Sequence, residues 1–185
     1  SFELSGADYA EYFEWADGNV DKIDRRGYFV TLDQEKIKIA TSSDKILGIV
    51  SSTPSVIGTF VENNKFQDFL VDEFGEIKKE MKEMTYTVQE WNEETHQYEL
   101  VEKTELVETQ IFNPDYDPDA RRDKDSSWAV IGLVGQLRVR DDGTCEPNGY
   151  CIVNDEGIAV PSEDKEHGYK VMSRLSNNII RILFK

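Results

Sequence analysis

The sequence predicts a mostly β (α+β) fold: a compact β-barrel-like or sandwich body with one helix and a long projecting β-hairpin. Many short runs rich in β-branched and aromatic residues are separated by turn signals at intervals of about 8–12 residues. A single segment has helical spacing, and a single long segment combines β-formers with a polar centre. Apolar residues make up 38% and aromatic residues 11% of the 185 residues, enough for the core of one domain.

The first segment, Gly6–Trp15, alternates as a strand with Tyr9 and Glu11 on one face and Asp8 on the other. A short helix is the alternative for this segment. The choice matters because residues three apart share a face of a helix but lie on opposite faces of a strand. Only a helix would therefore bring Asp8 and Glu11 together.

Further strands are expected before residue 61, each bounded by polar residues or by turn signals. They are Gly27–Leu32, Ile37–Ala40, Ile46–Val50 and Ser55–Phe60. Because Ile46–Val50 is apolar throughout, it is expected to be buried on both faces.

The middle of the chain, Asn63–Glu83, carries apolar residues at three- and four-residue spacings, which predicts a helix that ends near Gly75. The residues that carry the spacing are Phe66, Phe69, Leu70, Phe74 and Ile77.

The following segment, Thr85–Phe112, is dense in Thr, Val, Tyr and Glu, and it predicts a long β-hairpin that turns at Asn92–Thr95. Because a two-stranded ribbon is marginal in water by itself, this arm is expected to pair with another surface. We interpret residues 61–125 as an insertion in a single domain that spans residues 1–185.

The linker Asn113–Asp125 contains Asp115, Asp117 and Asp119, which resemble the start of a calcium loop. Ala120 stands where such a loop needs glycine, and Ser126 where it needs a bidentate glutamate. A solvated loop is therefore expected, and a calcium-dependent adhesion module is a weak alternative.

The last third is the clearest β region, with hairpin turn signals at Asp142-Gly143 and Asn148-Gly149. The expected strands are Trp128–Val134, Gln136–Arg140, Tyr150–Val153, Gly157–Val160, Gly168–Arg174 and Ile179–Phe184. In the last of these, Arg181 is expected to point away from the apolar face.

The composition excludes several classes of partner. Acidic residues number 37 against 21 Lys and Arg, for a net charge of −16, which argues against binding to nucleic acid or to an anionic membrane. No apolar run approaches the roughly 18–20 residues of a membrane span, and no basic region precedes an apolar one as in a signal peptide. A chain that begins with Ser1 fits either a processed end or a boundary within a longer protein.

Standard enzyme motifs are missing: there is no Walker loop, G-x-G-x-x-G, G-x-S-x-G or H-E-x-x-H. The two histidines, His96 and His167, are far apart and lie in predicted turns or loops, so a Ser-His-Asp triad is not expected. Cys145 and Cys151 are a poor zinc signature, so we expect no metal and either two free thiols or a pair facing each other across a hairpin.

The carboxylates near the start, Asp8 and Glu11, lie among four aromatic residues, where burial would raise a carboxyl pKa. Ser1 and Ser5 come just before them. A serine hydroxyl can attack the carbonyl of the preceding peptide bond when a base is near, and water then hydrolyses the ester. The fragment released begins with that serine.

The runs GADYAEYFEWADGN, RRGYFVTLD, ILGIVSSTPSVIG, WAVIGLVGQLRVRDDGTCEPNGYC and NNIIRILFK carry a specific resemblance. Over about Ser5–Gly58 and Trp128–Lys185, the chain resembles the autoproteolytic C-terminal domain of phage neck-appendage (tail-spike) proteins. That family is an intramolecular chaperone classed with the glutamic-type self-cleaving peptidases.

The resemblance implies that the chain promotes homotrimerisation of its precursor, contacts the upstream shaft and then cuts itself off. It maps the acidic catalytic residues onto Asp8 and Glu11, and the nucleophile onto Ser1 or Ser5. It implies assembly in the host cytoplasm and release of the domain from the mature appendage.

The resemblance also implies ATP binding, although the nucleotide-binding residues are unknown because the sequence has no phosphate loop. Arg25-Arg26 and Arg121-Arg122 are the basic pairs considered for this role, and structural or solvated roles are expected for each. The alternative function is a non-catalytic trimerisation or receptor-binding head at the end of a phage fibre.

Overall fold

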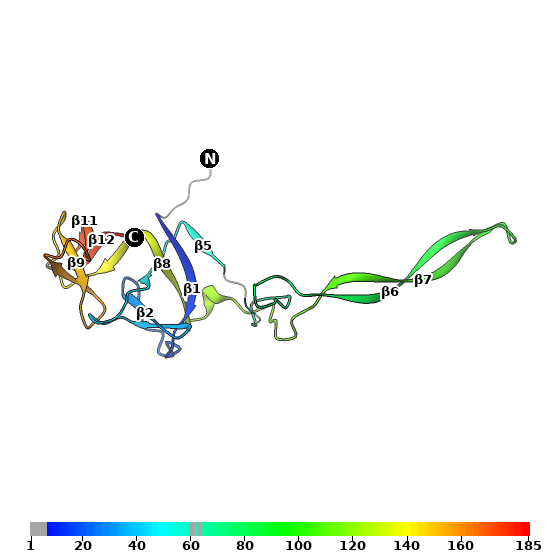
Figure 1. The fold of residues 1–185 in the computed structure, drawn as a ribbon, viewed down its shortest axis with the longest axis horizontal. Coiled ribbons are helices and arrows are strands. Elements are labelled where there is room, and N and C mark those ends of the chain that lie inside the picture. The colour runs from blue at the N-terminus through cyan, green and yellow to red at the C-terminus, as the bar shows by residue number, and fades with distance from the viewer. Residues whose placement is uncertain (1–6, 60–61, 63) are drawn as a thin grey trace. The chain divides into compact units, whose positions relative to one another are not determined.

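The structure is a computed structural model that describes residues 7–59, 62 and 64–185 (Figure 1). The chain divides into two compact units, one formed by residues 1–60 with 121–185 and the other by residues 61–120. Each unit is described by itself below.

The first unit contains one sheet of ten strands, which curls into a half-barrel (Figure 1). Its strands are β1 (Asp8–Glu14), β2 (Phe29–Asp33), β3 (Lys36–Ile39), β4 (Gly48–Val50), β5 (Val56–Gly58), β8 (Trp128–Arg140), β9 (Tyr150–Val153), β10 (Ala159–Ser162), β11 (Tyr169–Ser176) and β12 (Ile179–Phe184). The sheet order is β10-β9-β11-β12-β8-β4-β2-β3, with β1 between β5 and β8. The mostly β class predicted from the sequence is confirmed.

Strand β8 is the longest strand of this sheet and joins its parts. Its first half pairs with β1 and β4, and its second half pairs with β12. The sequence predicted two strands here, whereas the structure has one strand that passes through Gly135 with φ at +123°. A Cβ at Gly135 would lie 2.3 Å from the Ala7 carbonyl oxygen, so only glycine allows β1 to approach this closely.

Two clusters of buried side chains form the core of the first unit. The larger cluster includes Phe29, Val139, Ile180 and Ile182, and the smaller one is centred on Trp15. Buried Ile180 and Ile182 alternate with Arg181 along β12, which confirms the predicted alternation of that strand.

The first segment forms strand β1 and not a short helix. Asp8 and Ala10 are buried on one face, while Tyr9 and Glu11 share the other face with Phe13 and Trp15. The strand has a register shift between Tyr9 and Ala10, where it pairs with β8.

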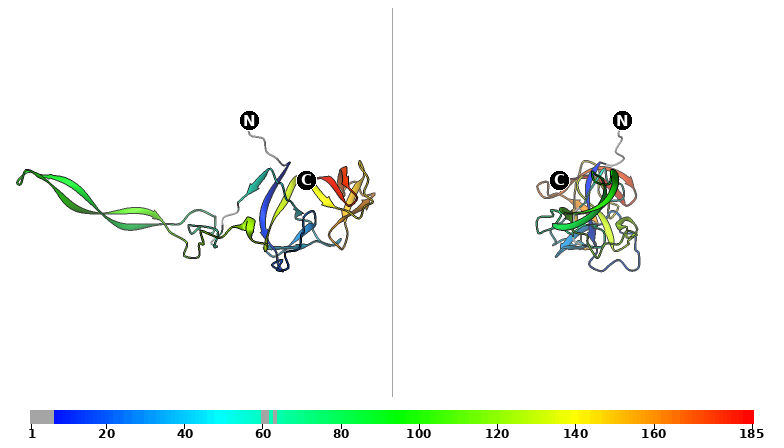
Figure 2. Two further views of the ribbon diagram at one scale, coloured as in Figure 1. Left: turned by 180° about the vertical axis from the view of Figure 1, so that it is seen from behind. Right: turned by 90° about the vertical axis from the view of Figure 1, so that its right-hand side faces the viewer.

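The second unit contains the predicted hairpin, formed by β6 (Lys79–Asn92) and β7 (Gln97–Gln110). All fourteen residues of each strand are paired, from Lys79 with Gln110 to Asn92 with Gln97. Figure 2 shows the two strands winding about each other as a ribbon, and they form a separate two-stranded sheet. The hairpin is confirmed and begins six residues earlier than the sequence indicated.

The predicted helix of the middle segment is wrong for its described residues. The Asn64 side chain accepts a hydrogen bond from the Phe66 N–H, and the Asp72 side chain accepts from the N–H groups of Phe74 and Glu76. These side chains compete with helical hydrogen bonds and fix turns in their place.

The part of the chain that the structure describes has one helical element, the 3-10 helix η1 (Arg122–Lys124), and no helix long and apolar enough to cross a membrane.

Replacing a buried β12 residue should destabilise the first unit far more than replacing an exposed neighbour. Ile182→Ala should lower the free energy of unfolding by about 2–5 kcal/mol, because Ile182 is fully buried. Leu175→Ala is the control; Leu175 is 45% exposed and should cost about 0.5 kcal/mol or less. Urea unfolding followed by tryptophan fluorescence measures both, and equal losses would contradict the assigned core.

Candidate functional site

The start of β1 opens into a pocket of about 420 Å³ in the first unit. The residues that line it include two carboxylates, three hydroxyls and four arginines. They are Asp8, Asp24, Ser51, Ser52, Thr53, Arg26, Arg138, Arg140 and Arg181. In a chain of net charge −16, a pocket lined by half of its eight arginines is a distinct electrostatic feature.

Asp8 is the buried carboxylate of this pocket, with 6% of its surface exposed. Burial raises the pKa of this carboxyl above its ordinary value, and a hydrogen bond from the Ser51 hydroxyl partly opposes the rise. Its Oδ2 atom is buried and has no hydrogen-bond partner among the described residues. A carboxyl with a raised pKa and a free oxygen is suited to proton transfer.

The place of Asp8 is fixed by close packing between β1 and β8. A Cβ at Gly132 would lie 2.9 Å from Asp8 Oδ2 and 2.4 Å from Leu137, so glycine at position 132 makes room for the carboxylate. Ser55 donates its backbone N–H to the Asp8 carbonyl oxygen, which ties this end of β1 to the chain before β5.

Glu11 lies on the other face of β1 from Asp8. Its Oε1 atom accepts a hydrogen bond of 2.6 Å from the Tyr9 hydroxyl, and this bond raises the pKa of Tyr9. Gly58 gives room for the contact, because a Cβ there would lie 2.1 Å from the Tyr9 hydroxyl oxygen. Strand β1 therefore places Asp8 and Glu11 on opposite faces, so these two carboxylates do not lie together within one chain.

The two predicted nucleophiles, Ser1 and Ser5, lie outside the described residues. Ser51, which contacts Asp8, was not singled out from the sequence. Ser51 directly follows β4. Nothing in the sequence around it indicates that the end of β4 lies beside the start of β1.

The arginines of the pocket fall into two pairs. Arg26 and Arg140 share Asp24, at 2.6 Å and 3.8 Å, and these contacts hold the pKa of Asp24 at about 2. Arg138 and Arg181 are cross-strand partners on β8 and β12. Neither has an ion pair among the described residues, and Arg181 Nε is buried without a hydrogen-bond partner there.

Of the arginines considered from the sequence, Arg26 alone lines the pocket. Arg25 pairs with Asp17 at 2.6 Å and lies over the Trp15 ring. Arg121 pairs with Asp123 at 3.0 Å, while Arg122 lies over the Trp128 ring. These three have structural contacts, whereas Arg138, Arg140 and Arg181 were missed although they alternate with buried residues in their strands.

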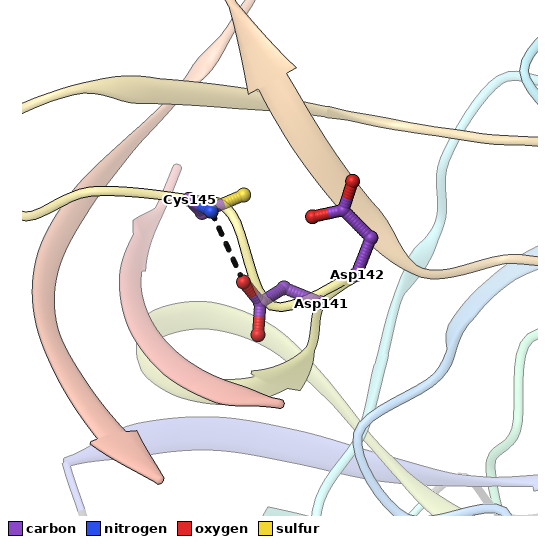
Figure 3. A group of neighbouring side chains, drawn as sticks. All are labelled: Asp141, Asp142 and Cys145. Atoms are coloured by element: carbon purple, nitrogen blue, oxygen red, sulfur yellow. Dashed lines mark hydrogen bonds between the residues drawn. The ribbon is translucent and has the colours of Figure 1, made fainter. Parts of the chain in front are cut away.

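Within the described part of the chain, one cluster brings together potential metal ligands: Asp141, Asp142 and Cys145, with ligand atoms within 4.8 Å of one another. Figure 3 shows the Asp141 carboxylate accepting a hydrogen bond from the Cys145 backbone N–H, at 3.2 Å. Both Asp141 oxygens also contact Arg174, at 3.3 Å and 2.7 Å. Arg174 already forms an ion pair with the Asp141 carboxylate. We therefore assign this carboxylate a structural role, in which it fixes the turn after β8.

Cys145 and Cys151 are both free and buried. The neighbouring Cys145 thiol, together with burial, raises the pKa of the Cys151 thiol. Both cysteines are therefore free thiols that lie close together in the core, so each of the two arrangements that the sequence left open describes them in part.

One Asn and one Asp side chain of the linker cap turns. Asn113 accepts the backbone N–H of Asp115, and Asp117 accepts that of Asp119. These hydrogen bonds match the solvated loop expected from the sequence.

Comparison with known proteins gives one family and a consistent set of relatives. The model of the family described as Peptidase_G2, IMC autoproteolytic cleavage domain, matches residues 1–178. The preneck appendage protein of Bacillus phage PZA is 35% identical over 184 residues, which cover 89% of this chain and 18% of that protein. The pre-neck appendage protein of Bacillus phage B103 is 32% identical over 85% of this chain and 16% of its own length. The chain thus spans less than a fifth of these relatives.

Two solved structures share the fold. The C-terminal fragment of the bacteriophage phi29 gene product 12 is 26% identical with a TM-score of 0.64, covering 96% of this chain and all of that one. The pre-mature bacteriophage phi29 gene product 12 is 25% identical with a TM-score of 0.65, covering this whole chain and 23% of that one.

The raised pKa of Asp8 should be visible in the pH dependence of stability. A carboxyl that binds its proton more tightly when folded stabilises the fold increasingly as the pH falls through its folded pKa toward 3.8. The stability of the wild type relative to Asp8→Asn should therefore rise as the pH falls from 7 to 4. Urea unfolding at several pH values measures this difference; a difference that is constant or falls would contradict the raised pKa.

Proposed function

This chain belongs to the Peptidase_G2 family of IMC autoproteolytic cleavage domains, and we propose that it cuts the peptide bond before one of its N-terminal serines. The cut would release it from a longer phage appendage protein, of the kind found among its relatives. The observation that carries the proposal is Asp8: a buried carboxyl with a raised pKa and an unpartnered oxygen, a few residues after both candidate serines.

The proposed reaction has two steps. The hydroxyl of Ser1 or Ser5 attacks the carbonyl carbon of the preceding residue, forming an ester bond as the amide C–N bond breaks and the serine nitrogen takes up a proton. Water then hydrolyses the ester, which leaves a carboxylate on the upstream fragment and restores the serine hydroxyl. Asp8 serves as the acid that protonates the leaving nitrogen and as the base that activates the attacking oxygen.

Ser51 supports this role because its hydrogen bond orients the Asp8 side chain. Glu11 was expected to share the acid–base work, but its face of β1 and its bond to Tyr9 place it away from Asp8. We therefore give Asp8 the main role and expect Glu11 to matter less in the same copy.

We further propose that the domain is an intramolecular chaperone that assembles three copies of its precursor and contacts the upstream shaft. The hairpin arm supports this, since nearly all of its residues are exposed and a ribbon of two strands gains from a partner. Assembly in the host cytoplasm, before release from the virion appendage, follows from this role.

The ATP implied by the family resemblance has one candidate site among the described residues. Arg138 and Arg181 lack a carboxylate partner in that part of the chain, and the buried Arg181 Nε atom there is an unused donor. Such a pair of arginines is suited to binding an anion, and the phosphates of a bound ATP would be that anion. Arg26 and Arg140 would border them.

A longer chain that keeps its natural upstream residues tests the proposed cleavage. Purified without added protease, it should yield a fragment that begins at Ser1 or Ser5, identified by intact mass and N-terminal sequencing. Asp8→Asn should slow the cut by about 100-fold or more, because the amide cannot transfer a proton. Glu11→Gln should slow it much less, since the amide oxygen still accepts the Tyr9 hydrogen bond.

Asp21→Asn, which removes an exposed carboxylate away from the pocket, is the matched control. Circular dichroism verifies the fold of each variant. Full cleavage by a folded Asp8→Asn chain would remove Asp8 from the mechanism. An uncut wild-type chain that is trimeric would favour the passive trimerisation or receptor-binding head.

A further inference from the structure

Arg138 and Arg181 are neighbours on one face of the sheet, directly opposite each other on β8 and β12. Like charges at such positions repel, which costs stability unless an anion lies between them. Asp24 forms ion pairs with Arg26 and Arg140, whereas no carboxylate within the described residues pairs with Arg138 or Arg181. The buried, unpartnered Nε atom of Arg181 adds a second sign of an absent acceptor.

The opposite charge is concentrated in the second unit. Residues 61–120 contain 17 acidic and 5 basic residues, so they carry −12 of the net −16. Residues 90–99 at the end of the hairpin, called the arm tip below, contain four glutamates and no lysine or arginine.

The arm tip has a like-charge pair of its own. Glu90 and Glu99 are cross-strand partners on β6 and β7, as Arg138 and Arg181 are on β8 and β12. Side-chain bonds from Asn92 and Thr95 lower the pKa of Glu99, which keeps it ionised. Glu90 is ion-paired with Lys103 within the ribbon.

Aromatic rings complete the arm tip. The next cross-strand pair is Trp91 with Tyr98, whose rings meet edge to face at 5.3 Å, and both are largely exposed. A guanidinium group binds carboxylates through two hydrogen bonds and stacks on aromatic faces. The arm tip therefore has the groups that recognise arginine.

We propose that, when no nucleotide occupies the Arg138–Arg181 pair, this pair binds the arm tip of a second copy, so that the arm tip and the phosphates proposed above compete for the same two arginines. The inference rests on the homotrimer proposed above and names the surfaces that hold it together. Two acidic arms would repel each other. A contact between the arms of two copies is therefore less favourable than a contact between an arm tip and the arginine pair. A fourteen-residue strand spans about 45 Å. A head-to-tail contact of this kind closes when three copies each donate one arm.

A charge exchange between copies tests the contact, with the chain of residues 1–185 in phosphate-free buffer without nucleotide. Arg138→Glu reverses the exposed member of the pair, and Glu94→Arg with Glu99→Arg reverses the arm tip. Each should weaken self-association by about 10-fold or more by sedimentation equilibrium, and an equal mixture of the two should recover part of it, because a mixed ring of three copies has two matched arm contacts out of three. Glu156→Lys with Glu163→Lys, exposed glutamates of the first unit, is the control and should leave association unchanged.

Unchanged association in both reversal variants would overturn the arm contact while leaving the trimer in place. Weakening without recovery in the mixture would also overturn it, because the two surfaces would then not be partners. A wild-type chain that stays monomeric at its highest soluble concentration would overturn both this inference and the proposed trimer. Cleavage of the longer chain is measured in a separate experiment, and its result does not depend on whether the arm contact exists.

Discussion

The double pairing of strand β8 is the constraint on which the rest of the first unit depends. Its first half holds β1 and β4, its second half holds β12, and Gly135 joins the halves at a φ that other residues rarely adopt. Gly132 on the same strand leaves the space that the Asp8 carboxylate fills. The curl of the sheet and the place of the candidate catalytic group thus have the same origin, a strand whose two glycines allow close approach.

The same geometry explains why only one of the two predicted carboxylates lies in the pocket. A strand sends residues three apart to opposite faces, so burying Asp8 beside Ser51 sends Glu11 to the side of Tyr9. Burial of an ionisable group costs stability, and here the group has an oxygen left without a partner among the described residues. Retaining such a cost is typical of sites that transfer protons.

The separation of charge between the two units is the basis of the contact between copies that we propose. The acidic second unit and the arginines of the first unit have opposite charge, and the cross-strand pair Arg138–Arg181 is a like-charge pair that an acidic partner would relieve. Assembly through such contacts would depend on ionic strength, as contacts between exposed charges do.

The sequence by itself determined the mostly β class, the hairpin and its turn, and the alternation that buries Ile180 and Ile182, because these follow from local periodicity and turn residues. It did not determine the middle segment, where side chains such as Asp72 fix turns in place of the expected helix. Only the tertiary structure decided that Asp8 meets Ser51 and that Arg138 lies opposite Arg181. These residues are 43 positions apart in each case, and their contact depends on strand pairing between distant segments, which no local pattern records.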